Sequence, residues 1–156
     1  MATAYAVARF IVQLAEDEAE TDYLTHLRIQ ELLYYAQSWS LVQRGVPLFP
    51  ERIEAWATGP VVRDLFERLS IHGRRAITSA DLEESDPDGL SEDEREFVAS
   101  VWEAYKGLSA WGLAQMIHED DPWVNARAGY GPLDRSDVEI TPEAMRAYFS
   151  LNQSRS

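Results

Sequence analysis

The chain has 156 residues, a length that fits one domain and can bury a hydrophobic core without crosslinks. It contains no cysteine, which excludes disulfides and thiolate metal sites, and no apolar run approaches the roughly 18 residues of a membrane-spanning helix. Its 27 acidic and 14 basic residues give a net charge of −13, which opposes binding to nucleic-acid phosphates or anionic membranes. The N-terminus also lacks the basic and apolar regions of a signal peptide, so we expect a soluble, cytoplasmic protein.

The first part of the chain shows helical periodicity. Apolar side chains within residues 4–15 recur every three or four positions and predict an amphipathic opening helix. A second, longer predicted helix carries apolar side chains over residues 29–39 and ends at Gly45, a residue type that commonly follows a helix C-terminus. Tyr34 and Tyr35 help to make this helix apolar around more than half of its circumference. We therefore expect it at the centre of the fold.

The middle of the chain combines strand-like alternation with a Gly-Pro pair. Residues 52–57 alternate between apolar and polar positions, which predicts a short strand. Gly59 allows a positive φ, and Pro60 suits the first position of a helix. The sequence therefore predicts a sharp corner that leads straight into an amphipathic helix. Residues 76–78 are expected to pair with the strand as a two-stranded β-ribbon.

Two further helices follow an acidic stretch. Residues 79–90 are rich in Asp and Glu around a proline and a glycine, and predict a solvated, mobile loop. Ser91 and Glu94 have the S-x-x-E spacing of a capping box, in which each side chain satisfies a free N–H of the first helical turn. This box opens a fourth helix, which ends near Gly107. Ser109 can cap a fifth helix.

The last predicted helix begins with typical N-terminal residues at 141–142. After the Pro-Trp pair at 122–123 the chain is expected to loosen, and Thr141 then serves as N-cap with Pro142 at the first helical position. The predicted fold is thus mainly α: one compact domain over 1–156 with its core at about 5–150. It has about six helices and a minor two-stranded β-ribbon.

No arrangement of residues points firmly to catalysis or to a metal. His118 is the one histidine that stands among carboxylates, at 119–121, and a metal would need further ligands from elsewhere. A histidine in the last turn of a helix is already favoured by the helix dipole. No serine shows the flanking glycines of a nucleophile elbow. We expect no enzyme activity, cofactor or metal, with a small enzyme using His118 and its acidic neighbours as the alternative.

The five tryptophans divide into two groups. Trp39 and Trp102 lie at helical spacing among apolar residues, so we expect them in the core. Trp56 and Trp123 lie next to prolines in or beside irregular segments, where an aromatic side chain can anchor a partner. For these two residues the core and the partner interpretations both stay open.

Four sequence blocks carry a resemblance to a known family. They are IQELLYYAQSW at 29–39, PLF at 47–49, EAWATGPVV at 54–62, and a helix ending in a histidine at 113–118 with a Pro-Trp pair at 122–123. In their order and spacing they resemble the Panacea, or SocA-like, antitoxin domain family of phage-associated proteins. The resemblance covers roughly residues 5–150. It identifies a set of structural signature residues: Trp39, Gly59, Pro60, His118 and Pro122.

The resemblance implies protein binding rather than catalysis. It implies an antitoxin that binds and blocks a cognate protein toxin encoded by an adjacent gene. Its alternative is a proteolytic adaptor that delivers the toxin to a cytoplasmic ATP-dependent protease. The acidic surface is either a solvated face or a face that attracts a basic partner, and no nucleic-acid or membrane partner is expected. The expected partner-binding residues are Tyr34, Tyr35, Trp56, Arg63 and Trp123.

One position departs from the family pattern. Glu31 stands where the family usually has a lysine in the block at 29–39. The exchange reverses a charge near the presumed core of the family. Any role that the lysine has in the family is therefore not expected here.

Overall fold

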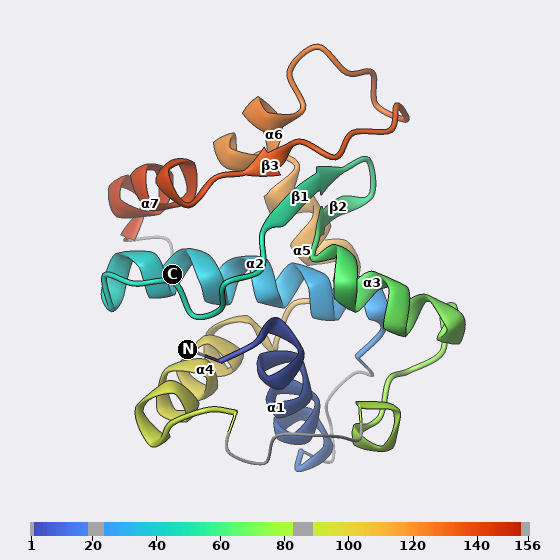
Figure 1. Ribbon diagram of the computed structural model, residues 1–156, viewed down its shortest axis with the longest axis vertical. Coiled ribbons are helices and arrows are strands. Elements are labelled where there is room, and N and C mark those ends of the chain that lie inside the picture. The colour runs from blue at the N-terminus through green and yellow to red at the C-terminus, as the bar shows by residue number, and fades with distance from the viewer. Residues whose placement is uncertain (1, 19–23, 83–88, 154–156) are drawn as a thin grey trace.

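The computed structural model of the chain describes residues 2–18, 24–82 and 89–153. Within these ranges it contains seven α-helices, two short 3₁₀-helices and one three-stranded sheet, which confirms the predicted mainly α class (Figure 1). The expected mobile loop at 79–90 begins with the 3₁₀-helix η2 (Ser79–Leu82), and its residues 83–88 lie outside the described residues.

Helix α2 (His26–Gln43) runs through the middle of the molecule, as the sequence predicts. Its residues from Arg28 to Leu41 are all buried, because α1, α4, α5, α7 and the sheet cover it on different sides. In Figure 1, α1 (Ala4–Glu16) and α4 (Glu92–Tyr105) lie below α2, while α7 (Pro142–Leu151) and the sheet lie above it. Arg44 caps its C-terminus, and Gly45 follows with a φ of 76°.

The local signals for helix starts are confirmed. Ser91 and Glu94 form the complete capping box of α4. Ser109 accepts a hydrogen bond from the Gly112 amide at the start of α5 (Ala110–Ile117), and Thr141 caps α7 in the same way. These signals were readable because a cap depends on residues that are close together in the sequence.

The Gly-Pro pair does not start a helix, contrary to the sequence prediction. Strands β1 (Ile53–Trp56) and β2 (Gly59–Val61) form a hairpin in which Trp56 pairs with Gly59. Gly59 has a φ of 139°, and Pro60 lies within β2. Proline is tolerated there because β2 is an edge strand, and helix α3 (Arg63–Leu69) begins only after it.

The predicted ribbon between residues 52–57 and 76–78 is also wrong. The second partner of β1 is β3 (Glu139–Ile140), in the strand order β2-β1-β3. Ile77 is buried, and its amide donates instead to the carbonyl of Leu24 at 2.7 Å. An alternating pattern identifies a strand but not the strand that pairs with it. A strand of two residues, such as β3, is too short to show an alternating pattern at all.

A short helix was missed where the chain was expected to loosen. Helix α6 (Asp121–Ala126) starts with Asp120 as N-cap and carries Pro122 in its first turn, a position that suits proline. It packs against α7 and β3. The remaining 3₁₀-helix, η1 (Ser70–His72), follows α3 directly. None of the helices in the described ranges has the length and apolar character that a bilayer span requires.

Candidate functional site

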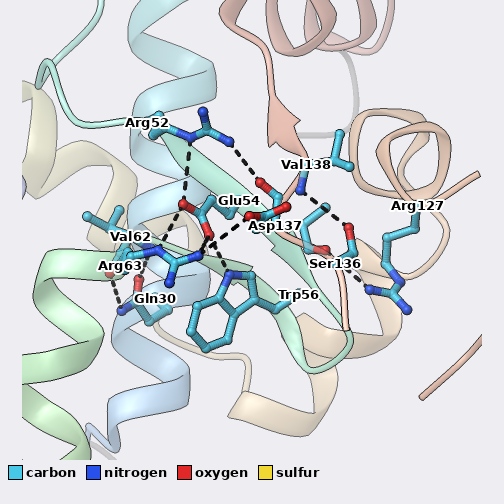
Figure 2. Close-up of polar contacts among 11 residues, drawn as sticks. Gln30, Arg52, Glu54, Trp56, Val62, Arg63, Arg127, Ser136, Asp137 and Val138 are labelled. Carbon is cyan, nitrogen blue, oxygen red and sulfur yellow. Dashed lines mark hydrogen bonds and ion pairs between the residues drawn. The ribbon is translucent and has the colours of Figure 1, made fainter. Parts of the chain in front are cut away.

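The candidate site is organised around Glu54 on the central strand. Arg63 donates to both oxygens of its carboxylate, from Nη2 at 2.9 Å and from Nε at 3.2 Å, and the Trp56 indole N–H donates at 2.8 Å. Figure 2 shows Arg52 on the other side of the carboxylate, where its Nε lies 3.6 Å from Oε2. Burial raises the pKa of Glu54, but the hydrogen bonds and the arginine charges outweigh it and lower that pKa below its usual range. Glu54 is therefore ionised, and both of its carboxylate oxygens accept hydrogen bonds.

The ring of Trp56 starts a row of aromatic side chains. The Arg63 guanidinium lies over the Trp56 ring, 5.5 Å from its centroid, and the Phe66 ring lies 4.7 Å away on α3. The His26 ring lies 5.0 Å beyond Phe66. In the other direction, the Trp123 indole N–H donates to the Trp56 carbonyl at 3.1 Å.

The row ends at His118, whose ring stacks on Trp123 with centroids 4.4 Å apart and planes 18° apart. We call these five side chains the aromatic band. Each of them is exposed or half-buried, so the band forms part of the molecular surface. Its members come from α2, α3, β1, α6 and the end of α5: His26, Phe66, Trp56, Trp123 and His118.

Arg127 is a buried residue that links the segments carrying Trp56 and Trp123. Its Nη1 donates to the Ala55 carbonyl at 3.2 Å, and its Nη2 donates to the carbonyls of Gly131 and Asp134 at 2.7 and 3.0 Å. The guanidinium also lies 5.5 Å from the centroid of the Trp123 ring. This buried arginine thus ties α6 and the loop after it to β1. No sequence pattern indicates this role, because the acceptors of Arg127 are backbone carbonyls.

A buried carboxylate fixes the start of α6. Asp120 accepts hydrogen bonds from the hydroxyls of Tyr34, Tyr35 and Tyr148, at 3.4, 3.0 and 3.1 Å. Burial, followed by the charge of Asp120, raises the pKa values of Tyr34 and Tyr35. Asp120 therefore joins α6 to α2 and α7, three residues before Trp123.

The expectation that Tyr34 or Tyr35 contacts a partner needs correction. Both side chains are buried in the core, at 0% and 1% exposure, so they present no surface in this structure. The reason is that α2 is covered on all sides. Of the expected partner-binding residues, the structure brings Trp56, Arg63 and Trp123 together. Sequence reasoning missed Phe66 and His26, whose place in the band depends on contacts between distant segments.

The signature residues have structural positions, with one exception. Trp39 lies in the core and donates from its indole N–H to the Tyr105 hydroxyl at 2.7 Å. Gly59 and Pro60 are the first two residues of β2, and Pro122 is buried in the first turn of α6. The exception is His118, which is exposed as the last member of the aromatic band.

Among the described residues, His118 and the carboxylates that follow it in the sequence do not gather into a metal-binding group. Burial, followed by the charge of Arg127, lowers the pKa of His118. The Asp120 carboxylate already accepts hydrogen bonds from the three tyrosine hydroxyls, and its neighbours Glu119 and Asp121 are exposed. In the part of the chain that the structure describes, no group of three or more His, Cys, Asp or Glu side chains is placed to hold a metal ion.

Glu31, which departs from the family pattern, lies in the core. Its side chain is fully buried, and neither carboxylate oxygen has a hydrogen-bond partner among the described residues. Burial raises the pKa of Glu31 to about 8, against the opposing charge of Arg28. This residue is therefore remote from any surface that a partner could contact.

Comparison with known proteins identifies the family. The model of the family described as "Antitoxin SocA-like, Panacea domain" matches residues 29–124, which is more than half of the chain. The chain therefore belongs to the family of SocA-like antitoxins with a Panacea domain. The matched region contains four of the five aromatic-band residues, all except His26, while β3 and α7 lie outside it.

A curated relative supports the same family. Antitoxin SocA from Caulobacter vibrioides (strain NA1000 / CB15N) is 29% identical to this chain over 109 residues. The aligned part is 64% of this chain and 58% of SocA, so the match spans little more than half of the relative. No solved structure matches the chain.

Proposed function

We propose that this protein is an antitoxin that neutralises a cognate protein toxin by direct binding through the aromatic band and Arg63. Membership of a SocA-like antitoxin family supports the antitoxin role. The position of Trp56, Arg63 and Trp123 on one surface supports the assignment of the binding site. The net charge of −13 is consistent with a toxin that carries a basic surface, because opposite fields speed the encounter of two proteins.

The observation that carries the site assignment is that the half-buried rings of Trp56 and Trp123 are already fixed. Trp56 is held by its bond to Glu54 and lies between Arg63 and Phe66, while Trp123 is held by the Trp56 carbonyl and by His118. Tryptophan and arginine are the residues most often found as binding hot spots. A ring that is fixed before binding loses little conformational entropy in the complex, so more of its contact energy appears as affinity.

The proposal is tested by expressing the product of the adjacent gene with and without this protein. If that product is toxic, the intact antitoxin restores growth and the two proteins copurify. Trp56→Ala is expected to weaken the complex at least tenfold, about 1.4 kcal/mol, as hot-spot truncations do. A neighbour that is harmless, or toxic but not neutralised, would contradict the antitoxin role.

Trp111 provides a matched control for Trp56. It is also a tryptophan on the surface, with 73% of its area exposed, but it is not part of the aromatic band. Trp111→Ala should leave affinity and growth rescue unchanged. If Trp111→Ala abolished binding while Trp56→Ala did not, the protein would still be an antitoxin, but the assigned surface would be wrong.

The same experiment distinguishes direct blocking from delivery to a protease. Under the proposal, the toxin stays at its normal level in rescued cells, and a purified mixture of the two proteins is inactive. The proteolytic adaptor predicts instead that the toxin disappears, and only where an ATP-dependent protease is present. Toxin abundance measured by immunoblot, with and without the antitoxin, separates the two.

A further inference from the structure

The junction between β2 and α3 is held by a side chain of α2. Val62 follows β2 directly and is the N-cap of α3, where its own side chain makes no capping bond. The Gln30 amide contacts both backbone groups of Val62: Val62 N–H donates to Gln30 Oε1 at 2.8 Å, and Gln30 Nε2 donates at 3.3 Å to the Val62 carbonyl (Figure 2). That carbonyl also accepts the first intrahelical bond, from the Phe66 amide at 3.0 Å. Because an N–H only donates and a carbonyl only accepts, these two bonds fix which way round the Gln30 amide lies.

The orientation of Gln30 in turn fixes the state of His26. Gln30 Nε2 also lies 3.4 Å from His26 Nε2, within reach of its second hydrogen. An amide nitrogen has no lone pair to offer, so His26 Nε2 must be the acceptor. The ring is then neutral and carries its hydrogen on Nδ1. If His26 were protonated, two donors would face each other.

The other groups around His26 also favour the neutral ring. The uncharged Phe66 ring faces it from α3, and His72 of η1 is near enough to act on it electrostatically. Behind His72 lie Arg75, which contacts His72 Nδ1, and Asp81, which is 3.9 Å from His72 Nε2. Burial, followed by the charge of His72, lowers the pKa of His26. His26 is also the first residue of α2, where the helix dipole disfavours a positive charge.

We propose that Gln30 and His26 are positioning residues of the partner surface: the neutral His26 ring locks Gln30 onto Val62, and protonation of the ring releases the junction that carries Arg63. A protonated ring places a second donor opposite Gln30 Nε2. The conflict between the two donors is relieved when the Gln30 amide turns its oxygen to His26, and this turn breaks both bonds to Val62. The effect on a toxin rests on the proposed function, whereas the lock is a property of the free protein.

Nuclear magnetic resonance on the free, full-length protein tests the lock without a toxin. At pH 7.5, His26 should be the tautomer with its hydrogen on Nδ1. As the pH falls to 5, exchange protection of the Val62 amide, corrected for the intrinsic rate, should drop at least tenfold. The midpoint of that drop should coincide with the titration of His26. A hydrogen on Nε2 at pH 7.5, or Val62 protection that is constant while His26 titrates, would overturn the inference.

Three variants sharpen the test. In His26→Gln an uncharged acceptor replaces the ring, so Val62 protection should stay high at every pH; the wild-type drop in this variant would overturn the inference. His118→Gln removes the other histidine of the band and should leave the drop in place. If His26→Gln fails to fold, His72→Gln serves instead. The His72→Gln exchange removes a neighbouring charge, so His26 should titrate at a higher pH. The pH midpoint for the loss of Val62 amide protection should move with it. If the two midpoints moved separately, the lock would be refuted.

Binding to the toxin tests whether the lock affects the partner surface. Its affinity should fall below the midpoint of the His26 titration in the wild type and not in His26→Gln. An affinity that is independent of pH in both proteins would refute the link between the lock and partner binding. Growth rescue by the antitoxin would still support the proposed function in that case, so the two failures are distinguishable.

Discussion

Two buried glutamates show how differently this protein treats the same side chain. Glu54, on the central strand beneath the aromatic band, receives hydrogen bonds from Arg63 and Trp56, and its pKa lies below the usual range. Glu31, inside the central helix, has no hydrogen-bond partner for its carboxylate among the described residues, and its pKa is raised to about 8. Burial alone thus does not determine ionisation. The donors around Glu54 stabilise its ionised form, whereas burial without hydrogen-bond donors keeps Glu31 neutral.

The largest effect is expected when Glu31 is removed. In the unfolded chain Glu31 ionises near pH 4.5, whereas in the folded protein it stays protonated up to about pH 8. The free energy of unfolding should therefore fall as the pH rises from about 4.5 to about 8, and this loss is complete above that range. Glu31→Leu should raise the free energy of unfolding at pH 8.5 by about 3 kcal/mol, because an unpaired buried charge is replaced by an apolar group.

Urea unfolding at pH 5 and at pH 8.5 measures this effect. The gain from Glu31→Leu should be much smaller at pH 5, where Glu31 is already neutral. Glu96→Leu is the control, because Glu96 is exposed on a helix and its exchange should change stability by no more than about 0.5 kcal/mol. An equal gain from Glu31→Leu at both pH values would show that Glu31 is not the titrating group.

A smaller effect of opposite sign is expected at Glu54. Glu54→Gln replaces a charged acceptor by an amide, so the bonds from Arg63 and Trp56 weaken and the free energy of unfolding at pH 7 should fall by about 2 kcal/mol. Because the pKa of Glu54 is lowered, its stabilisation is present above its ordinary pKa and is lost as the pH falls through the folded value. The variant should thus approach the wild type in acid. A variant as stable as the wild type at pH 7 would remove the contrast between the two glutamates.

The smallest effect concerns a third buried acid, Asp120. Tyr148→Phe deletes one of its three phenolic donors and leaves two, so the free energy of unfolding should fall by only about 1 kcal/mol. Thermal unfolding at pH 7 is sufficient to measure it. A loss as large as that expected for Glu54→Gln would mean that the bond from Tyr148 carries most of the Asp120 network.

What the sequence could predict was mostly local. Five of the helices, the caps at Ser91, Ser109 and Thr141, and the end of α2 depend on neighbouring residues and were predicted correctly, whereas the start of α3 was misplaced at Pro60. The partner of β1 was not, because β3 lies more than eighty residues away and is two residues long. Helix α6 was missed because its six residues are too few to show helical periodicity before the glycines that follow.

The site was predicted in part for the same reason. Trp56, Arg63 and Trp123 lie in or beside the recognised blocks, and the fold places them together. Tyr34 and Tyr35 were assigned to the surface because aromatic residues often anchor partners, but a helix covered on every side has no surface. Phe66 and His26 entered the site only through contacts made across α2, α3 and the sheet.

The central claim is that a toxin binds the aromatic band, and the indole resonances of the five tryptophans test it most directly. In a ¹⁵N spectrum, unlabelled toxin is added to the labelled antitoxin until the complex is saturated. The account predicts that the indole signals of Trp56 and Trp123 shift or broaden most, while the buried Trp39 and Trp102 and the exposed Trp111 stay nearly unchanged. A spectrum in which Trp111 alone responds, with Trp56 and Trp123 unmoved, would contradict it.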